Sequence, residues 1–273
     1  MEYITAKNNQ RVVYTSKLLQ KKYRELFGEF SVCGKKLVYE ASLRKMAARK
    51  IFTTEEFLNK NREYFAAVTD IIGKNAEIIV TNNEIMRKIS GEEAPEGILC
   101  TFGCIDKSEK IDKIYNNTLC HGIKGGIIIL DSMRDPGNMG TVIRSAYAFG
   151  TGLIIASPDC ADIYSPKVQR GAMGASFSQN IMIADTRSTV RQLRENGFNV
   201  YATALHRKSI ELCNVSVNEK TAFVIGNEAN GLPDDIIELC SGSVIIPISP
   251  DSESLNASVA SSVIMWEMSK NFR

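Results

Sequence analysis

Thr221-Ala-Phe-Val-Ile-Gly-Asn-Glu-Ala-Asn-Gly-Leu-Pro233 is the stretch that decides the fold of this chain of 273 residues. It opens with an apolar run typical of a buried strand, and the run stops at Gly226, where the backbone can come close to a ligand. A second run, Val244–Ile248, also ends in a polar loop, and the helix after that loop is expected to be capped near Asn256. Ligands of open α/β sheets bind outside the carboxyl ends of parallel strands, so these two strand ends predict a binding crevice.

A third apolar run of the buried-strand type, Gly126–Asp131, has a polar segment after it. Pro136–Gly137 indicates a tight turn in that segment, and the apolar spacing beyond it predicts a helix that ends at Gly150. Asn138 is then expected at the mouth of this helix. Arg144 lies further along, and helical side chains lean toward the helix N-terminus, so its guanidinium can reach the same mouth.

Three segments of the chain resemble, in order, the motifs of the SpoU (TrmH-type) RNA ribose 2′-O-methyltransferases of the SPOUT superfamily. They are Asp135–Gly140 with Arg144, Gly226–Gly231, and Ile246–Ile248 with Ser254–Asn256. The segment Ser165–Ala175 also resembles the small-residue helix of that family. Any one of these matches is weak alone, whereas the ordered set is specific.

Strands and helices alternate through the second half of the chain, which predicts an α/β domain over residues 116–273 with a mostly parallel sheet. We expect strands at 126–131, 152–156, 180–184, 198–203, 221–226 and 243–248, and helices at 139–149, 165–176, 187–196, 234–240 and 256–270. The resemblance implies a further feature, a deep trefoil knot in the C-terminal part. Ordinary fold rules treat knots as nearly absent, so the knot follows from the resemblance alone.

The first half of the chain alternates too, which predicts a smaller α/β domain over residues 1–115, with the polar segment 108–121 as the link to the next domain. We expect an amphipathic helix at 16–27 with Leu18, Leu19, Tyr23 and Leu26 inward, helices at 36–48 and within 54–66, and strands at 30–33, 50–52, 77–81 and 97–103. Phe30–Val38 resembles part of the substrate-binding domain that often precedes the catalytic domain in the same family. Cys33 stands where family members usually carry an acidic residue.

The net charge of +2 hides an uneven distribution along the chain. Residues 1–50 hold twelve Lys and Arg against four Asp and Glu, while residues 116–273 hold thirteen against fifteen. Since Lys and Arg neutralise phosphates, the first domain is the better candidate for binding RNA. A solvated helix face explains the same charges equally well.

The composition indicates the expected location of the protein and whether it binds a metal. The chain has no apolar run near the roughly 20 residues of a membrane span and no signal-peptide core at its start, so a soluble, cytoplasmic protein is expected. Its seven cysteines include no Cys-x-x-Cys pair, which favours buried, reduced thiols and no metal. Cys100 and Cys104 with Cys120 and His121 are the alternative metal group, although their spacing fits no common zinc pattern.

The resemblance implies S-adenosyl-L-methionine as the cofactor. Gly226, Ile246 and Leu255 align with positions that contact the cofactor in the family, and Thr203, which closes another strand, adds a wall to the expected site. Short apolar side chains and backbone groups at strand ends suit an adenosine moiety. The alternative is that these residues belong only to the core of the sheet.

Removal of the proton from a ribose 2′-hydroxyl requires a base near that hydroxyl. The two histidines, His121 and His206, lie outside the motifs, and the resemblance assigns the role to Arg144 with help from an RNA phosphate. A guanidinium holds its proton to about pH 12, so binding the phosphate or orienting the hydroxyl is an equally consistent role.

The resemblance also aligns Asn138, Glu228, Ser254 and Asn256 with polar positions of the three motifs. The two asparagines suit fixing the loop and the ribose, and Glu228 suits anchoring Arg144 or a backbone amide. Asn256 as a plain helix cap and Ser254 as a turn residue are the alternatives.

Family members are homodimers, and we expect Val263, Trp266 and Met268 of the last helix to serve such an interface or to lie in the core. Ribosomal RNA is the preferred substrate, and transfer RNA is the alternative. A nucleotide-dependent oxidoreductase is excluded because no Gly-x-Gly-x-x-Gly follows a first strand. A non-catalytic RNA-binding or ribosome-associated protein of the same fold is the remaining alternative.

Overall fold

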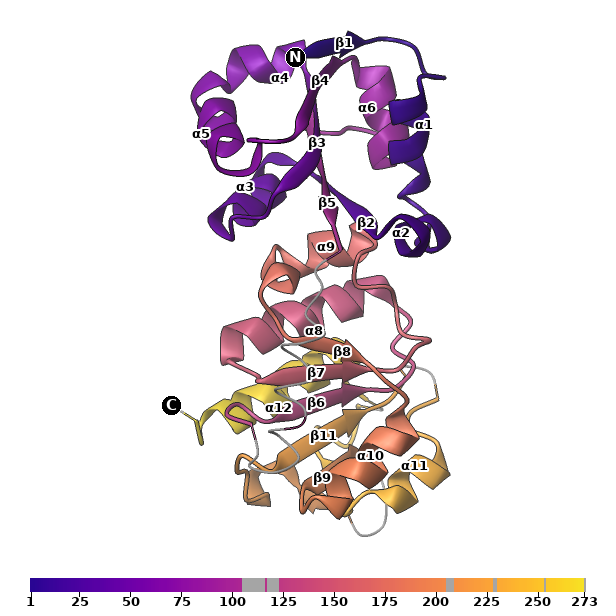
Figure 1. Ribbon diagram of the computed structural model, residues 1–273. Coiled ribbons are helices and arrows are strands. Elements are labelled where there is room, and N and C mark those ends of the chain that lie inside the picture. Colours follow the sequence, from indigo (N-terminus) through magenta and orange to yellow (C-terminus); the bar gives the residue numbers. More distant parts are fainter. Residues whose placement is uncertain (105–115, 117–122, 205–208, 228–229, 253, 273) are drawn as a thin grey trace. The chain divides into compact units, whose positions relative to one another are not determined.

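The computed structural model describes residues 1–104, 116, 123–204, 209–227, 230–252 and 254–272 of the chain (Figure 1). The chain forms two compact units, the first made of residues 1–105 and 162–177 and the second of residues 106–161 and 178–273. The segment 162–177, which the sequence places in the second domain, thus clusters with the first unit. The domain boundaries at 1–115 and 116–273 stay a prediction.

The first unit contains a five-stranded mixed sheet in the order β1-β4-β3-β5-β2. β5 pairs antiparallel with both β2 and β3, whereas β4 pairs parallel with both β1 and β3. The strands are β1 Glu2–Ile4, β2 Glu29–Cys33, β3 Ala48–Thr54, β4 Glu77–Thr81 and β5 Ile98–Gly103. The helices are α1 Gln10–Lys17, α2 Lys21–Phe27, α3 Lys35–Leu43, α4 Glu55–Lys60, α5 Arg62–Ile72 and α6 Asn83–Ser90. The sequence did not predict β1 or α6.

The predicted single helix at 16–27 is wrong, because the chain turns between α1 and α2. Leu18 is buried in that turn, whereas Leu26 is 68% exposed. The buried residue of α2 is Arg24, which has a polar partner in the segment 162–177. The predicted inward face is therefore wrong for α2, because the turn changes which side of this helix faces inward.

Two other predicted helices of this unit have different bounds. The helix expected at 36–48 ends at Leu43, after which Lys45 has a φ of +53°. The helix expected within 54–66 is two helices, α4 and α5, which meet at Asn61, where the φ of −133° interrupts the helical conformation.

The segment 162–177 completes the core of the first unit. It contains α9, Pro166–Ala172, and a short 3-10 turn, Ala175–Phe177, where a continuous helix at 165–176 was expected. The helix ends early because Met173 adopts a left-handed conformation with φ +51°. The rings of Tyr164 and Phe177 pack against Phe30 of β2, with centroids 4.7 and 6.4 Å away.

The second unit contains a seven-stranded sheet, and every pair of neighbouring strands in it is parallel, as the sequence predicted. The order is β10-β12-β9-β11-β6-β7-β8. The strands are β6 Ile127–Leu130, β7 Leu153–Ala156, β8 Ile181–Ile183, β9 Asn199–Thr203, β10 Ile210–Glu211, β11 Thr221–Ile225 and β12 Gly242–Ile245. Only the two-residue β10 was not predicted.

Helices cover both faces of this sheet (Figure 1). They are α8 Pro136–Phe149, α10 Thr186–Glu195, α11 Asp234–Leu239 and α12 Ala257–Ser269. α8 packs with α12 on one face, and α10 packs with α11 on the other. Val190, Leu193 and Ile236 fill the core beneath the second pair.

The residues Pro136 and Gly137 begin α8 and do not form the expected separate turn. Proline is favoured in a first helical turn because its missing N–H would have no helical partner there. Asp135 caps this turn by accepting a hydrogen bond from the backbone N of Asn138 at 2.7 Å. The helix ends at Gly150 in a left-handed conformation, which confirms the predicted stop.

None of the helices that the structure describes is both long and apolar enough to cross a lipid bilayer.

Candidate active site

A cavity of about 620 Å³ opens at the carboxyl ends of β9, β11 and β12, beside the start of α12. Thr203, Gly226, Ile246 and Leu255, the four residues that the sequence predicts for the cofactor, all line it, and so does Ser254. The cavity falls within the range of roughly 300–1,000 Å³ that is usual for small-molecule sites. The strand ends therefore converge on one pocket, while contact of these residues with a cofactor stays a prediction.

The walls of the cavity combine apolar residues with polar ones. Ile225, Ile264 and Pro247 are apolar lining residues, and the loop after β12 contributes Ser249, Ser252 and Ser254 to the lining. The hydroxyl of Thr203 donates to the backbone oxygen of Val224 at 2.8 Å, so it ties two neighbouring strand ends together. Such a lining suits a ligand with a flat, weakly polar ring system.

Position 226 requires glycine because the loop that follows it closes back against this residue. A Cβ atom built on it would lie 2.4 to 2.7 Å from backbone atoms of Gly231 and Leu232. The loop is closed by Asn227 and Gly231, whose backbones exchange hydrogen bonds of 3.1 and 2.9 Å. The sequence led us to expect close approach of a ligand at Gly226, and the structure places the loop backbone there.

Two of the predicted catalytic residues meet directly. Nδ2 of Asn256 donates to Oδ1 of Asn138 at 3.0 Å. Oδ1 of Asn256 accepts from the backbone N and the hydroxyl of Ser258, at 2.9 and 2.7 Å, so the predicted cap of α12 is confirmed. The first turn of α8 and the loop before α12 are thereby joined.

Arg144 and Ser254 are both exposed to solvent, on α8 and on the loop that precedes α12. Ser254 lies on the cavity wall beside Leu255, whose side chain is 36% exposed. The predictions for Glu228, His121 and His206 fall outside the described residues. The catalytic roles of the five predicted residues stay predictions; these residues are Asn138, Arg144, Glu228, Ser254 and Asn256.

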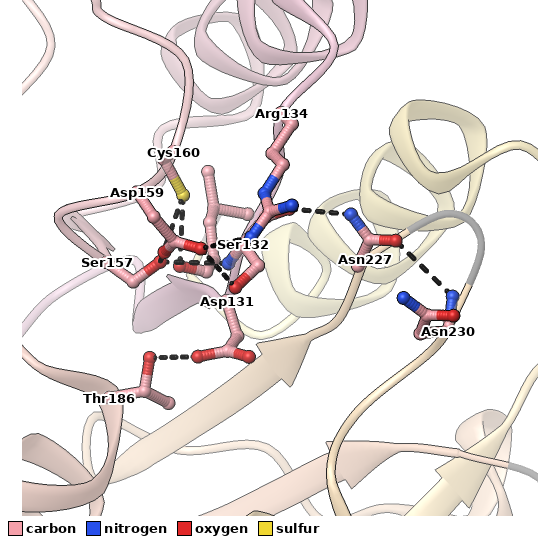
Figure 2. Close-up of polar contacts among 10 residues, drawn as sticks. Asp131, Ser132, Arg134, Ser157, Asp159, Cys160, Thr186, Asn227 and Asn230 are labelled. Atoms are coloured by element: carbon pink, nitrogen blue, oxygen red, sulfur yellow. Dashed lines mark hydrogen bonds and ion pairs between the residues drawn. The ribbon is translucent and has the colours of Figure 1, made fainter.

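A polar network that the sequence did not predict lies at the carboxyl ends of β6, β7 and β11 (Figure 2). It contains Ser132, Arg134, Ser157, Asp159 and Asn227. Hydrogen bonds from the hydroxyls of Ser157 and Ser132 lower the pKa of Asp159 to about 2. Asn227 lies in the motif segment Gly226–Gly231, whereas the other four residues belong to no motif, and their one available sequence signal was their position just after strands.

Asp131 anchors the start of the same loop from within the sheet edge (Figure 2). It is 7% exposed, and Oδ1 accepts from the hydroxyl of Thr186 at 2.5 Å. Its backbone N donates to the oxygen of Ile225 at 2.8 Å. The last strand residue of β11 and the first turn of α10 therefore fix where the loop leaves the sheet.

Within the described ranges, no three His, Cys, Asp or Glu side chains are grouped so as to hold a metal ion. Cys120 and His121 of the alternative metal group lie outside these ranges. Burial raises the pKa of the Cys240 thiol to about 11 and also raises the pKa of Cys100. These two thiols are therefore protonated at neutral pH, which is typical of cysteines that serve packing.

Two family models match the chain. Residues 126–266 match the SpoU rRNA Methylase family, and residues 9–100 match the MRM3-like substrate binding domain. The first match covers the second-unit sheet from β6 onward together with the cavity and both asparagines.

Similar proteins match over nearly the whole chain. The 23S rRNA (guanosine(2553)-2′-O)-methyltransferase RlmP of Bacillus subtilis is 25% identical, over 98% of this chain and 99% of its own. The 23S rRNA (guanosine-2′-O-)-methyltransferase RlmB of Ralstonia nicotianae is 30% identical, over 70% of this chain and 75% of its own. The crystal structure of an AdoMet-bound rRNA methyltransferase from Sinorhizobium meliloti superimposes with a TM-score of 0.82 at 26% identity, over 98% of this chain and 97% of that one.

Proposed function

This chain belongs to the SpoU rRNA methylase family, and from that premise we propose that it methylates the 2′-hydroxyl of a ribose in ribosomal RNA, with S-adenosyl-L-methionine as donor. The observation that carries the proposal is the hydrogen bond between Asn138 and Asn256. It joins the first and third family motifs beside a cavity lined by Gly226 of the second motif and by Ile246 and Leu255 of the third.

The residues of the cavity fit the proposed cofactor. An adenine ring needs apolar walls and backbone partners, which Ile246, Leu255 and the loop after β12 supply. The bound cofactor supplies an electrophilic methyl group on a sulfonium. The similar structure from Sinorhizobium meliloti, whose name states that it binds AdoMet, supports the same assignment.

The acceptor ribose is assigned to polar groups of the first turn of α8 and of the loop before α12. We assign Asn138 and Asn256 to fixing these two segments and the ribose, and Ser254 to the cavity rim between ribose and cofactor. Arg144 binds the RNA phosphate or orients the 2′-hydroxyl, because its side chain is exposed on α8 and a guanidinium presents several N–H donors that suit a phosphate. Glu228 is assigned to supporting this group.

Recognition of the RNA is assigned to the first unit. Its residues 9–100 match a substrate-binding domain, and residues 1–50 carry the excess of Lys and Arg. The names of the relatives support ribosomal RNA over transfer RNA, because RlmP and RlmB both act on 23S rRNA. Both act on a guanosine, so a guanosine ribose is the first acceptor to examine.

A homodimer is also proposed. α8 and α12 present an apolar patch made of Phe149, Val259, Val263 and Trp266, in which the rings of Phe149 and Trp266 pack edge to face at 5.7 Å. Val259 and Trp266 are 47% and 43% exposed. Met268 is 1% exposed, so the expectation that it serves the interface does not hold, and it packs inside the monomer. Sedimentation of Trp266→Glu as a monomer and of the wild type as a dimer would support this patch as the interface.

The trefoil knot and the cytoplasmic location complete the proposal. The order of the sheet favours the knot, since the late strand β11 lies between β6 and β9 and the chain after β12 returns to pack α12 on α8. The location follows from the sequence expectation alone.

The test uses the full chain with a labelled methyl donor and separate pools of ribosomal and transfer RNA. We expect transfer to ribosomal RNA, with one ribose becoming resistant to alkaline hydrolysis. Transfer only to tRNA would show that tRNA, and not ribosomal RNA, is the substrate. A methyl group on a base would show that the enzyme does not methylate ribose. Absence of both transfer and calorimetric binding of S-adenosylmethionine would favour a non-catalytic RNA-binding protein.

A further inference from the structure

Asp159 lies just beyond the end of β7 and gathers three donors on its carboxylate (Figure 2). Oδ1 accepts from the hydroxyl of Ser157 at 2.6 Å. Oδ2 accepts from the hydroxyl of Ser132 at 2.7 Å and from the guanidinium of Arg134 at 3.1 Å. Ser132 and Arg134 both belong to the loop that leads from β6 into α8. A carboxylate after one strand therefore holds the loop after the neighbouring strand.

The residue that Asp159 holds has an unusual backbone. Ser132 has a φ of +56°, a left-handed conformation that residues with a side chain rarely adopt without support. Its hydroxyl is bound by Asp159, and its backbone N donates to the hydroxyl of Ser157 at 2.8 Å. Ser157 is buried, at 6% exposure, and is itself bound to Asp159. Both polar groups that fix this conformation thus depend on one carboxylate.

The left-handed turn at Ser132 directs its carbonyl toward the loop after β11. The oxygen of Ser132 accepts from Nδ2 of Asn227 at 2.8 Å (Figure 2). Asn227 also shapes its own loop, because its Oδ1 accepts from the backbone N of Asn230 at 3.3 Å and its backbone pairs with Gly231. Gly226, Asn227 and Gly231 of that loop line the cofactor cavity.

These hydrogen bonds form a continuous path between the loop that leads into α8 and the loop after β11 that lines the cavity. It runs from Asp159 through Ser132 to Asn227 and the cavity wall. In the other direction, the loop that Asp159 holds continues to Asp135, the cap that orients the first turn of α8 and Asn138. Asp159 itself does not line the cavity. Its influence on the site must therefore pass through the loops.

We propose that Asp159 is a positioning residue for methyl transfer, which holds the loop that leads into α8 and Asn138 in register with the loop that borders the cofactor cavity. The inference rests on the proposed function. A shift of about 1 Å between reacting groups costs roughly 100-fold in rate, so a loop held by three bonds controls the rate even at a distance. The low pKa of Asp159 supports the idea, since the carboxylate is charged throughout the range in which the enzyme would work.

The test compares Asp159→Ala with Asp185→Ala in the full chain. Asp185 is a matched control because it follows β8 at the same edge of the sheet and accepts a backbone bond from Ser188 at 2.9 Å, but it has no bond to Ser132. The measurements are the thermal midpoint, calorimetric binding of S-adenosylmethionine, and kcat and KM for ribosomal RNA.

We expect Asp159→Ala to lower kcat about 10- to 100-fold with KM for RNA within about threefold, and to weaken cofactor binding. Asp185→Ala is expected to shift the thermal midpoint and to leave both kcat and cofactor binding near the wild-type values. A second variant, Ser132→Gly in the Asp159→Ala background, is expected to regain several-fold of the lost kcat, because glycine adopts the left-handed conformation without the bonds.

Three outcomes would overturn the proposal. The first is an Asp159→Ala enzyme with kcat within twofold of wild type. The second is an equal loss of kcat in both aspartate variants in proportion to unfolded protein, which would make the role purely structural. The third is a wild-type enzyme that methylates no RNA. This result would contradict the proposed function itself, and it is distinguished from the other two because it is seen without any variant.

Discussion

Asn256 uses the two ends of one amide for two different elements. Its oxygen caps α12 by accepting from Ser258, and its nitrogen donates to Asn138 at 3.0 Å, across 118 positions of sequence. The first bond stabilises the start of α12. The second joins the loop before α12 to the first turn of α8, the two segments assigned to the ribose. Since separate atoms make these bonds, substitutions can remove them one at a time.

Asn256→Ser is expected to keep the cap and lose the link. Serine caps helices about as well as asparagine, but its hydroxyl is too short to reach Asn138. The free energy of unfolding should stay within about 0.5 kcal/mol of wild type, while methyl transfer falls at least about tenfold. Asn256→Ala, the matched variant, should lose the same activity and an additional ~1 kcal/mol of stability. Full activity in the serine variant would show that the link has no part in the reaction.

Arg144→Ala is expected to fold normally and to lose methyl transfer. The side chain is exposed, and surface substitutions of this kind usually change stability by less than about 0.5 kcal/mol. Thermal unfolding and single-turnover methylation of ribosomal RNA measure the two effects. Retention of full activity would remove Arg144 from the proposed site.

Arg144→Lys separates the two roles that remain open for this residue. If the guanidinium acts electrostatically, the rate of either enzyme should depend little on pH between about 7 and 9.5, and the lysine enzyme should be slower throughout. If the side chain takes the proton, the rate of either enzyme should rise about tenfold with each pH unit over this range, because the pKa of lysine, about 10.4, and the higher pKa of arginine both lie above it. We expect the uniform loss, because arginine keeps its proton over this range.

Gly226→Ala is expected to disrupt the cavity loop. The added Cβ would lie 2.4 to 2.7 Å from backbone atoms that cannot move as a side chain can. Overpacking of this kind typically costs about 1–3 kcal/mol, and the calorimetric affinity for S-adenosylmethionine should fall with it. Gly150→Ala is the control, because Gly150 has a φ of +74° but open space around it. It should lose some stability and bind the cofactor normally.

The cavity was predictable from sequence because strand ends obey a simple rule. Gly226, Ile246 and Thr203 each follow or end a run of apolar residues, and parallel strands bring such ends to one edge. The pairing of Asn138 with Asn256 was not predictable in this way. It depends on how α8 and α12 pack, which the periodicity of either helix leaves open.

The errors in the sequence prediction have equally local causes. Leu26 fits an amphipathic helix at 16–27, but the turn at Leu18 and the buried Arg24 rotate α2. Ser132 gives no sequence signal for its positive φ, because serine rarely adopts it and does so here only with the support of Asp159. Polar bonds between residues far apart in the chain leave no pattern in a single sequence.

The acid dependence of stability should reveal the Asp159 network. Hydrogen bonds from Ser157 and Ser132 lower the pKa of Asp159 in the folded protein to about 2, below the usual ~3.9 of an unfolded aspartate. The contribution is therefore complete above about pH 4 and is lost as the pH falls toward 2. Urea unfolding of wild type and Asp159→Asn at pH 7, 5, 4 and 3 should give a stability difference that is constant at first and then shrinks. A difference that stays constant down to pH 3 would contradict the assignment.

Arg24→Met is expected to destabilise the first unit strongly. Nε and Nη2 of Arg24 both donate to Oδ2 of Asp162, at 2.8 and 2.6 Å, and Nη1 donates to the backbone oxygen of Leu18. The two side chains are only 5% and 15% exposed, so removal of one leaves a buried charge without its partner. Such losses typically cost about 3–5 kcal/mol, which thermal or urea unfolding would detect easily.

Two further variants distinguish this buried pair from an ordinary surface pair. Arg24→Met with Asp162→Leu removes both charges and should recover most of the stability that the single variant loses, because no unpaired charge remains. Lys60→Ala breaks an ion pair with Glu56 whose side chains are 71% and 61% exposed, and it should leave unfolding unchanged. If Arg24→Met unfolds like Lys60→Ala, the segment 162–177 is not anchored through Asp162, and the aromatic packing of Tyr164 and Phe177 on Phe30 must hold it instead.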